Sequence, residues 1–97
     1  MTDFRFTSSA LSELTQATLH YEEKENGLGG IFLDEVDATV ARILADPAAW
    51  HPLSPRTRRC RTHRFPFGVI YQIRPAEILI LSVIDLRRDP TNWKHLL

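Results

Sequence analysis

The chain has 97 residues, of which 43% are hydrophobic and 25% charged, and its formal net charge is zero. This composition is that of an ordinary globular protein with one core, so we expect a single domain over residues 1–97 and exclude separate cofactor and substrate domains. The one cysteine, Cys60, excludes an internal disulfide. No apolar run reaches about 18 residues and the N-terminus lacks a signal-peptide pattern, so we expect a cytoplasmic protein without membrane contact.

The zero net charge comes from two halves of opposite sign. Residues 1–50 hold nine carboxylates and three cations, whereas residues 51–97 hold nine cations and three carboxylates. Such segregation favours a basic face for an anionic partner, either nucleic acid or an acidic protein surface. The alternative is that the two halves simply pair with each other.

Hydrophobic periodicity predicts one strand and two helices in the acidic half. Residues 3–7 alternate as a short half-buried strand does, and the hydroxyls of residues 7–9 can cap the helix that follows. That helix should end at Asn26–Gly27, and a second should run from residues 28–30 to Asp46–Pro47. Because their connection is short and rich in glycine, we expect an antiparallel helical hairpin.

The basic half is predicted to form a loop and a three-stranded meander. The loop covers residues 48–57, where Trp50 should pack against the helix ends. The meander strands are expected at residues 58–65, 67–73 and 78–84. The last of these is an almost unbroken aliphatic run, so it should lie centrally in the sheet with both faces covered.

A short C-terminal helix is predicted after the meander. Asp89 can cap it, Pro90 suits its first turn, and Trp93 lies within it. The complete order is β-α-α-β-β-β, an α+β fold in which the helical hairpin packs on a mainly antiparallel four-stranded sheet and the short helix follows.

The first meander strand carries a row of cations. Alternation places Cys60 and Thr62 on its buried face. The opposite face then carries Arg59, Arg61 and His63, spaced about 7 Å apart, which is twice the strand rise. Clustered cations can bind phosphates and stabilise charge at a transferring phosphorus, while a histidine or tyrosine can shuttle a proton. The same cluster could dock on an acidic protein surface instead.

The wider set of candidate binding residues covers this strand, the next strand and the end of the chain. Its members are Arg58, Arg59, Arg61, His63, Arg64, Tyr71, Arg87, Arg88 and Trp93.

Other chemistry has little support in the sequence. Cys60 is expected to face inward, and no motif marks it as a reactive thiol with a lowered pKa. The chain has no nucleophile-elbow motif, no paired carboxylates at acid–base spacing and no phosphate-binding glycine loop. No cofactor and no metal site are expected, and whether the protein is an enzyme stays open.

An ordered set of short motifs spans most of the chain. In the first half these are A-x-x-E-L at residues 10–14, YEE at 21–23, GLG at 27–29 and F-x-x-E-V at 32–36. In the second half they are RFPFGVIYQI, an aliphatic strand and RRDPTNW. This set, from Phe4 to Trp93, resembles the RelE/ParE superfamily of toxins from bacterial type II toxin–antitoxin pairs. The resemblance implies a compact α+β domain, a cytoplasmic location and a cognate antitoxin that folds over the toxin.

Two branches of that superfamily imply different targets. The ribonuclease branch cuts translated mRNA on the ribosome, and its basic residues would correspond to Arg59 and Arg61, with His63 and Arg87 as further catalytic candidates. That branch carries an arginine where this chain has Gly68.

The C-terminal tyrosine of the ribonuclease branch is also not evident in this chain. Trp93 lies in that region, but an indole cannot transfer a proton as a phenol does. The ParE-like branch is the closer resemblance, and it implies inhibition of DNA gyrase by binding. Asp85 departs from that pattern, since relatives often have a histidine after the aliphatic strand. A third reading is a relative that keeps the fold and binds an antitoxin without being toxic.

Overall fold

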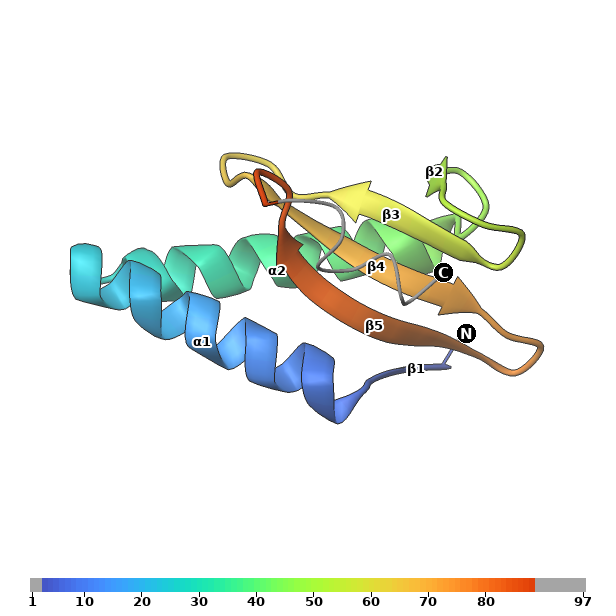
Figure 1. Ribbon diagram of the computed structural model, residues 1–97, viewed down its shortest axis with the longest axis horizontal. Helices are drawn as coiled ribbons and strands as arrows, with labels where there is room; N and C mark the ends of the chain where they lie inside the picture. Colours follow the sequence, from blue (N-terminus) through green and yellow to red (C-terminus); the bar gives the residue numbers. More distant parts are fainter. Residues whose placement is uncertain (1–2, 89–97) are drawn as a thin grey trace.

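Two helices pack on one face of a mixed five-stranded sheet in the computed structural model, which describes residues 3–88 (Figure 1). The elements in chain order are β1 (Asp3–Phe6), α1 (Ser8–Lys24), α2 (Leu28–Ala45), β2 (His51–Pro52), β3 (Thr57–Arg61), β4 (Phe67–Ile73) and β5 (Glu77–Asp85). The predicted α+β fold is confirmed. The sheet has one strand more than predicted, because β2 forms inside the segment expected to be a loop. The predicted C-terminal helix and Trp93 lie outside the described residues.

The helical hairpin is capped largely by its own side chains. The Thr7 hydroxyl accepts the backbone N–H of Ala10 at 3.1 Å, as predicted for the start of the first helix. Gly27 adopts a left-handed conformation with a φ of 89° and precedes α2 without a side-chain cap of its own. The Glu22 carboxylate supplies that cap, accepting the N–H groups of Gly27 and Gly29 at 3.0 Å each. The end of α1 therefore caps the start of α2.

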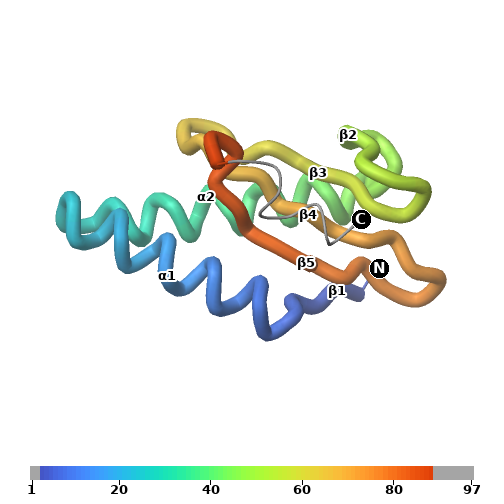
Figure 2. The backbone as a smooth tube through the Cα atoms, viewed as in Figure 1, coloured from blue at the N-terminus to red at the C-terminus, as the bar shows by residue number. Residues whose placement is uncertain are grey.

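The two helices run antiparallel and approach each other closely near their connection (Figure 2). At Gly29, a Cβ atom would lie 2.8 Å from the backbone oxygen of Thr18 and 3.0 Å from the Glu22 side chain. At Gly30, a Cβ atom would meet nothing within 4 Å. Only the first of these two glycines is required by helix packing.

The sheet has the strand order β1-β5-β4-β3-β2, with β1 parallel to β5 and the other pairs antiparallel. The aliphatic run is therefore an interior strand as predicted, although β4 is the middle strand of the five. Strand β5 is buried on both faces, as predicted. Ile80 and Val83 belong to the core shared with the helices, and Leu79 and Ile84 on the opposite face are 4% and 6% exposed.

The core lies between the helices and the sheet. Phe32, Val36 and Ile43 of α2 are fully buried and belong to one cluster with Val69 and Ile80 of the sheet. Trp50 packs against this cluster and donates its indole N–H to the carbonyl of Arg42, so its predicted position is confirmed. Neither helix of the described part combines the length and the apolar character needed to cross a membrane.

The two adjacent glycines of α2 give a matched pair of substitutions. We expect Gly29→Ala to lower the free energy of unfolding by about 1–3 kcal/mol, because the new methyl group overlaps a backbone oxygen of α1. Gly30→Ala should raise it by about 0.5–1 kcal/mol through helix propensity alone. Urea denaturation of both variants measures the difference. Equal effects would contradict the close helix approach.

Candidate binding surfaces on the sheet and the helical hairpin

The turn between β3 and β4 presents the cationic end of the sheet. Strand β3 ends at Arg61, so the strand predicted to reach Phe65 is four residues too long. The chain turns there because Thr62 bonds across the turn: its hydroxyl lies 3.0 Å from the carbonyl oxygen of Phe65 and 3.2 Å from that of Phe67. Arg64 completes the turn in a left-handed conformation with a φ of 69°.

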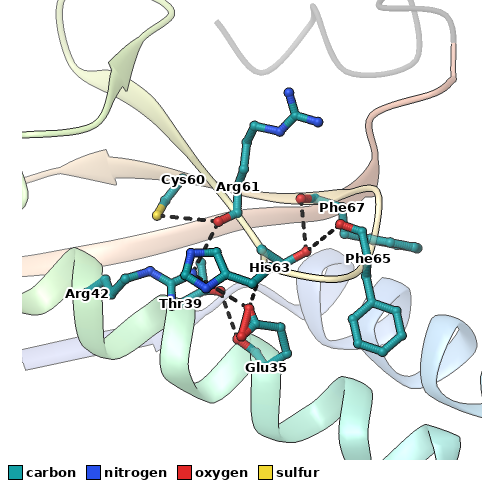
Figure 3. Close-up of polar contacts among 9 residues, drawn as sticks. Glu35, Thr39, Arg42, Cys60, Arg61, His63, Phe65 and Phe67 are labelled. Carbon is teal, nitrogen blue, oxygen red and sulfur yellow. Dashed lines mark hydrogen bonds and ion pairs between the residues drawn. The ribbon is translucent and has the colours of Figure 1, made fainter.

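Two charged side chains of α2 hold this turn against the helix (Figure 3). The carboxylate of Glu35 accepts the backbone N–H of His63 at 2.5 Å. The guanidinium of Arg42 donates to the Arg61 carbonyl at 3.2 Å and to the Thr39 hydroxyl at 2.9 Å. Arg42 and Glu35 also form an ion pair with an N–O distance of 3.7 Å. Helical periodicity places both residues on the polar side of α2, but periodicity does not reveal the polar partners that they find there.

Arg59 and Arg61 lie on the sheet face turned away from the helices, as predicted; this pair is the arginine face. Cys60 between them belongs to the core, and Figure 3 shows the Arg61 side chain pointing away from α2. Arg59 lies against Gly68 on the neighbouring strand. A Cβ atom at Gly68 would be 3.1 Å from Cγ of Arg59 and 3.0 Å from Cδ2 of Leu86. An arginine at position 68 would therefore have to displace both neighbours.

Three other candidates are not brought to this face. His63 lies in the turn beyond β3 and does not continue the row. Arg58 is half-buried and donates to the Trp50 carbonyl at 2.8 Å. Tyr71 is fully buried, and its hydroxyl donates to the carbonyl oxygen of Pro47 at 2.5 Å. The placement of Tyr71 among surface cations is wrong, because its register in β4 turns it towards the helices. Burial raises the pKa of Tyr71, so it stays a neutral phenol.

The remaining candidates differ in their partners. Arg64 and Arg88 are exposed. Arg87 forms an ion pair with Asp85 at 2.7 Å, and its hydrogen bonds to that carboxylate lower the pKa of Asp85. Asp85, which stands where relatives often have a histidine, is thus a partner for a neighbouring arginine.

Residues 3–88 contain neither an activated nucleophilic thiol nor a metal-binding cluster. Cys60 is buried as predicted, and burial raises the pKa of its thiol, which disfavours the reactive thiolate. Within the same range, no three metal-binding side chains gather into one group.

A groove with a volume of about 430 Å³ separates α1 from the C-terminal half of β5. It exists because β1 pairs with β5 only as far as Ile80, so no other strand of the described residues covers the edge of β5 beyond that point. Glu13 of α1 occupies part of this edge, accepting the Ser82 hydroxyl at 2.8 Å and the Val83 N–H at 3.2 Å. The residues lining the groove are Glu13, Gln16, Ala17, His20, Tyr21, Phe67, Val83, Ile84, Asp85, Arg87 and Arg88.

Packed aromatic side chains form part of the floor of the groove. Tyr21 packs against Phe32, Phe65 and Phe67, with ring centroids 4.9–6.0 Å apart. Burial raises the pKa of Tyr21, which makes it a neutral part of the floor at physiological pH. Sequence reasoning missed this groove, although the signal was present in the unequal lengths of the first and last strands.

The family model for the ParE toxin of the type II toxin–antitoxin system parDE matches residues 4–90. The chain belongs to the ParE toxin family. A solved structure described as the chromosomal ParDE toxin–antitoxin system from P. aeruginosa is similar in fold, with a TM-score of 0.66 and 22% sequence identity over 89% of this chain and 97% of that one. No curated protein matches the sequence.

Charge in this ParE family member is separated by layer. Residues 8–45, which form the helical hairpin, hold seven carboxylates and two cations, whereas residues 51–88 hold eight arginines and two carboxylates. The three ion pairs found within residues 3–88 lie inside one layer or the other, so the two layers do not neutralise each other. The exposed large hydrophobic side chains of the same range lie on β1 and the helices: Phe4, Leu11, Leu19, Ile31 and Leu33.

The Glu35 contact gives a test of how the turn is held. We expect Glu35→Ala to lower the free energy of unfolding by about 1.5–3 kcal/mol, the value of a hydrogen bond to a charged group, and to speed amide exchange at His63. The exposed neighbouring variant Asp34→Ala should stay within about 0.5 kcal/mol of the parent. Unchanged exchange at His63 would show that the turn does not depend on α2.

Proposed function

We propose that this chain is the toxin of a type II toxin–antitoxin pair, that it inhibits DNA gyrase by binding, and that a cognate antitoxin neutralises it in the cytoplasm. The match of residues 4–90 to the ParE toxin model carries the proposal. The shared fold with a component of a ParDE system supports an antitoxin as partner.

The geometry of the arginine face favours binding over RNA cleavage. A ribonuclease needs a group that moves a proton beside the cations that hold the phosphate. Tyr71 cannot serve as this group because it is buried, and His63 lies in the turn beyond β3, out of line with Arg59 and Arg61. The space where the ribonuclease branch has its additional arginine is filled by the side chains of Arg59 and Leu86 around Gly68. Within residues 3–88, Arg59 and Arg61 remain as a binding pair without a catalytic partner.

The gyrase target can be tested with purified protein. We expect it to block DNA supercoiling by gyrase or to trap gyrase on cleaved DNA, and to leave translated mRNA intact. Both readouts can be followed by gel electrophoresis in reconstituted reactions. Normal gyrase activity together with cleaved mRNA would overturn the proposal and support the ribonuclease reading. Normal growth of cells that express the chain alone would support a non-toxic relative.

The antitoxin is proposed to bind in the groove between α1 and β5. The groove has aromatic side chains in its floor and a strand edge that no other strand within residues 3–88 covers, the two features that a folding segment of a partner chain uses. Exposed leucines elsewhere on the helices, Leu11, Leu19 and Leu33, add apolar area that a longer partner segment could cover. Binding there would bury hydrophobic area that the toxin otherwise exposes to water.

A bulky side chain at the rim tests this site. Gln16 is exposed and lines the groove, so Gln16→Trp should fill it without unfolding the protein and weaken antitoxin binding by about tenfold or more. The matched control is Thr15→Trp, an exposed position on the same helix that does not line the groove. Isothermal titration calorimetry with the antitoxin compares them. A larger loss with Thr15→Trp would move the site to the outer face of the hairpin.

A further inference from the structure

We propose that the arginine face, formed by Arg59 and Arg61, is a binding site for the phosphate backbone of duplex DNA. The inference rests on the proposed function and extends it: the toxin would contact the DNA that gyrase holds as well as the enzyme.

The first observation is that residues 51–88, which contain the arginine face, have too few carboxylates to neutralise it. Their two carboxylates are already paired, Glu77 with Arg5 at 3.0 Å and Asp85 with Arg87 at 2.7 Å. Seven of the eight arginines in residues 51–88 have no ion-pair partner within the described residues. The Nε atom of Arg59 is also buried without a hydrogen-bond acceptor in that part of the chain. A phosphate oxygen near this guanidinium would supply the negative charge that residues 51–88 lack.

The second observation is the kind of cation. Every cation in residues 51–88 is an arginine, and lysine is absent from that range. Lysine would serve equally well if the charge were needed only for solubility. The guanidinium group is planar and presents a fork of donors that fits two oxygens of one phosphate or carboxylate. The composition therefore points to an oxyanion ligand.

The third observation decides between a nucleic acid and an acidic protein. Hot spots of protein interfaces are enriched in tryptophan and tyrosine as well as arginine, so a protein-binding face is expected to present apolar area beside its arginines. Within residues 3–88, the exposed large hydrophobic side chains lie on β1, α1 and α2, and none lies on β3, β4 or β5. Contacts to a phosphate backbone need no such anchor, because charge and hydrogen bonds supply them. The arginine face has the composition expected for DNA, and the helical layer has the composition expected for a protein partner.

The fourth observation is that the arginine face is held in place before any ligand binds. The carbonyl of Arg61 is fixed by Arg42, and the aliphatic part of Arg59 lies over Gly68. The two side chains are spaced by about 7 Å along one strand. Duplex DNA presents one negative charge per roughly 1.7 Å of its axis, so both guanidinium groups can reach phosphates at the same time.

The test measures binding of a short fluorescein-labelled DNA duplex by fluorescence anisotropy over a series of salt concentrations. The variant is Arg59→Ala/Arg61→Ala. The control is Arg56→Ala/Arg74→Ala, which removes the same charge from exposed positions at the other end of the sheet. We expect the first pair to weaken binding about tenfold or more and to reduce the slope of log K against log salt by about 2, and the control to change the slope less. Circular dichroism confirms folding of each variant.

Three results would overturn the proposal. Equal losses in both double variants would show a diffuse charge effect without a site. Binding of poly-glutamate as tight as that of the duplex, lost in the Arg59→Ala/Arg61→Ala variant, would assign the face to an acidic protein. Inhibition of gyrase by a protein with no measurable affinity for the duplex would remove the DNA site and leave the proposed function standing. Duplex binding that depends on Arg59 and Arg61 without any effect on gyrase would instead support the site and overturn the gyrase target.

Discussion

The charged bridge between α2 and the turn after β3 determines how this protein presents its arginines. Glu35 and Arg42 bind backbone atoms of the turn, one as an acceptor and the other as a donor, and they also bind each other. Because the contacts are to the backbone, they fix the end of β3 whatever side chains it carries. The helix thus sets the direction in which Arg61 leaves the strand, and hydrogen bonds to charged groups are strong enough to hold it there.

Separation of charge between the layers gives the molecule two unlike surfaces. A sheet layer whose arginines mostly have no ion-pair partner within residues 3–88 attracts anions over distances up to about the Debye length, roughly 8–10 Å at moderate salt. The helical layer repels the same anions and exposes leucines, so it suits a protein chain that covers apolar area. One small domain can therefore engage two partners on opposite sides. This arrangement fits a toxin that must meet both a target and an antitoxin.

Periodicity in the sequence was sufficient for most of the fold. The helices, their hairpin connection and the interior position of the last strand follow from the spacing of apolar residues, and the cap at Thr7 and the turn at Gly27 follow from residue type. Alternation also placed Arg59 and Arg61 on the correct face. The inclusion of Tyr71 among the binding residues was wrong, because residue type gives no sign that a phenol will find a buried carbonyl oxygen.

Features that depend on distant parts of the chain could not be found in the same way. The end of β3 is set by a helix residue almost thirty positions earlier, and the groove is set by how far the first strand extends along the last. The short strand β2 forms because His51 and Pro52 meet β3 after the loop folds back. Local sequence patterns carry no information about such long-range contacts, which depend on the packed structure.

The parallel pairing of β1 with β5 also has a consequence for the order in which the molecule is assembled. The helical hairpin closes through contacts five to seven residues apart, such as those of Glu22, and these can form as soon as that segment leaves the ribosome. The pairing of Asp3 with Glu77, by contrast, has to wait until nearly the whole chain has been synthesised. The groove beside β5 comes into existence only at that stage. An antitoxin that binds in this groove would therefore recognise the fully synthesised toxin and would not bind a chain that is still being translated.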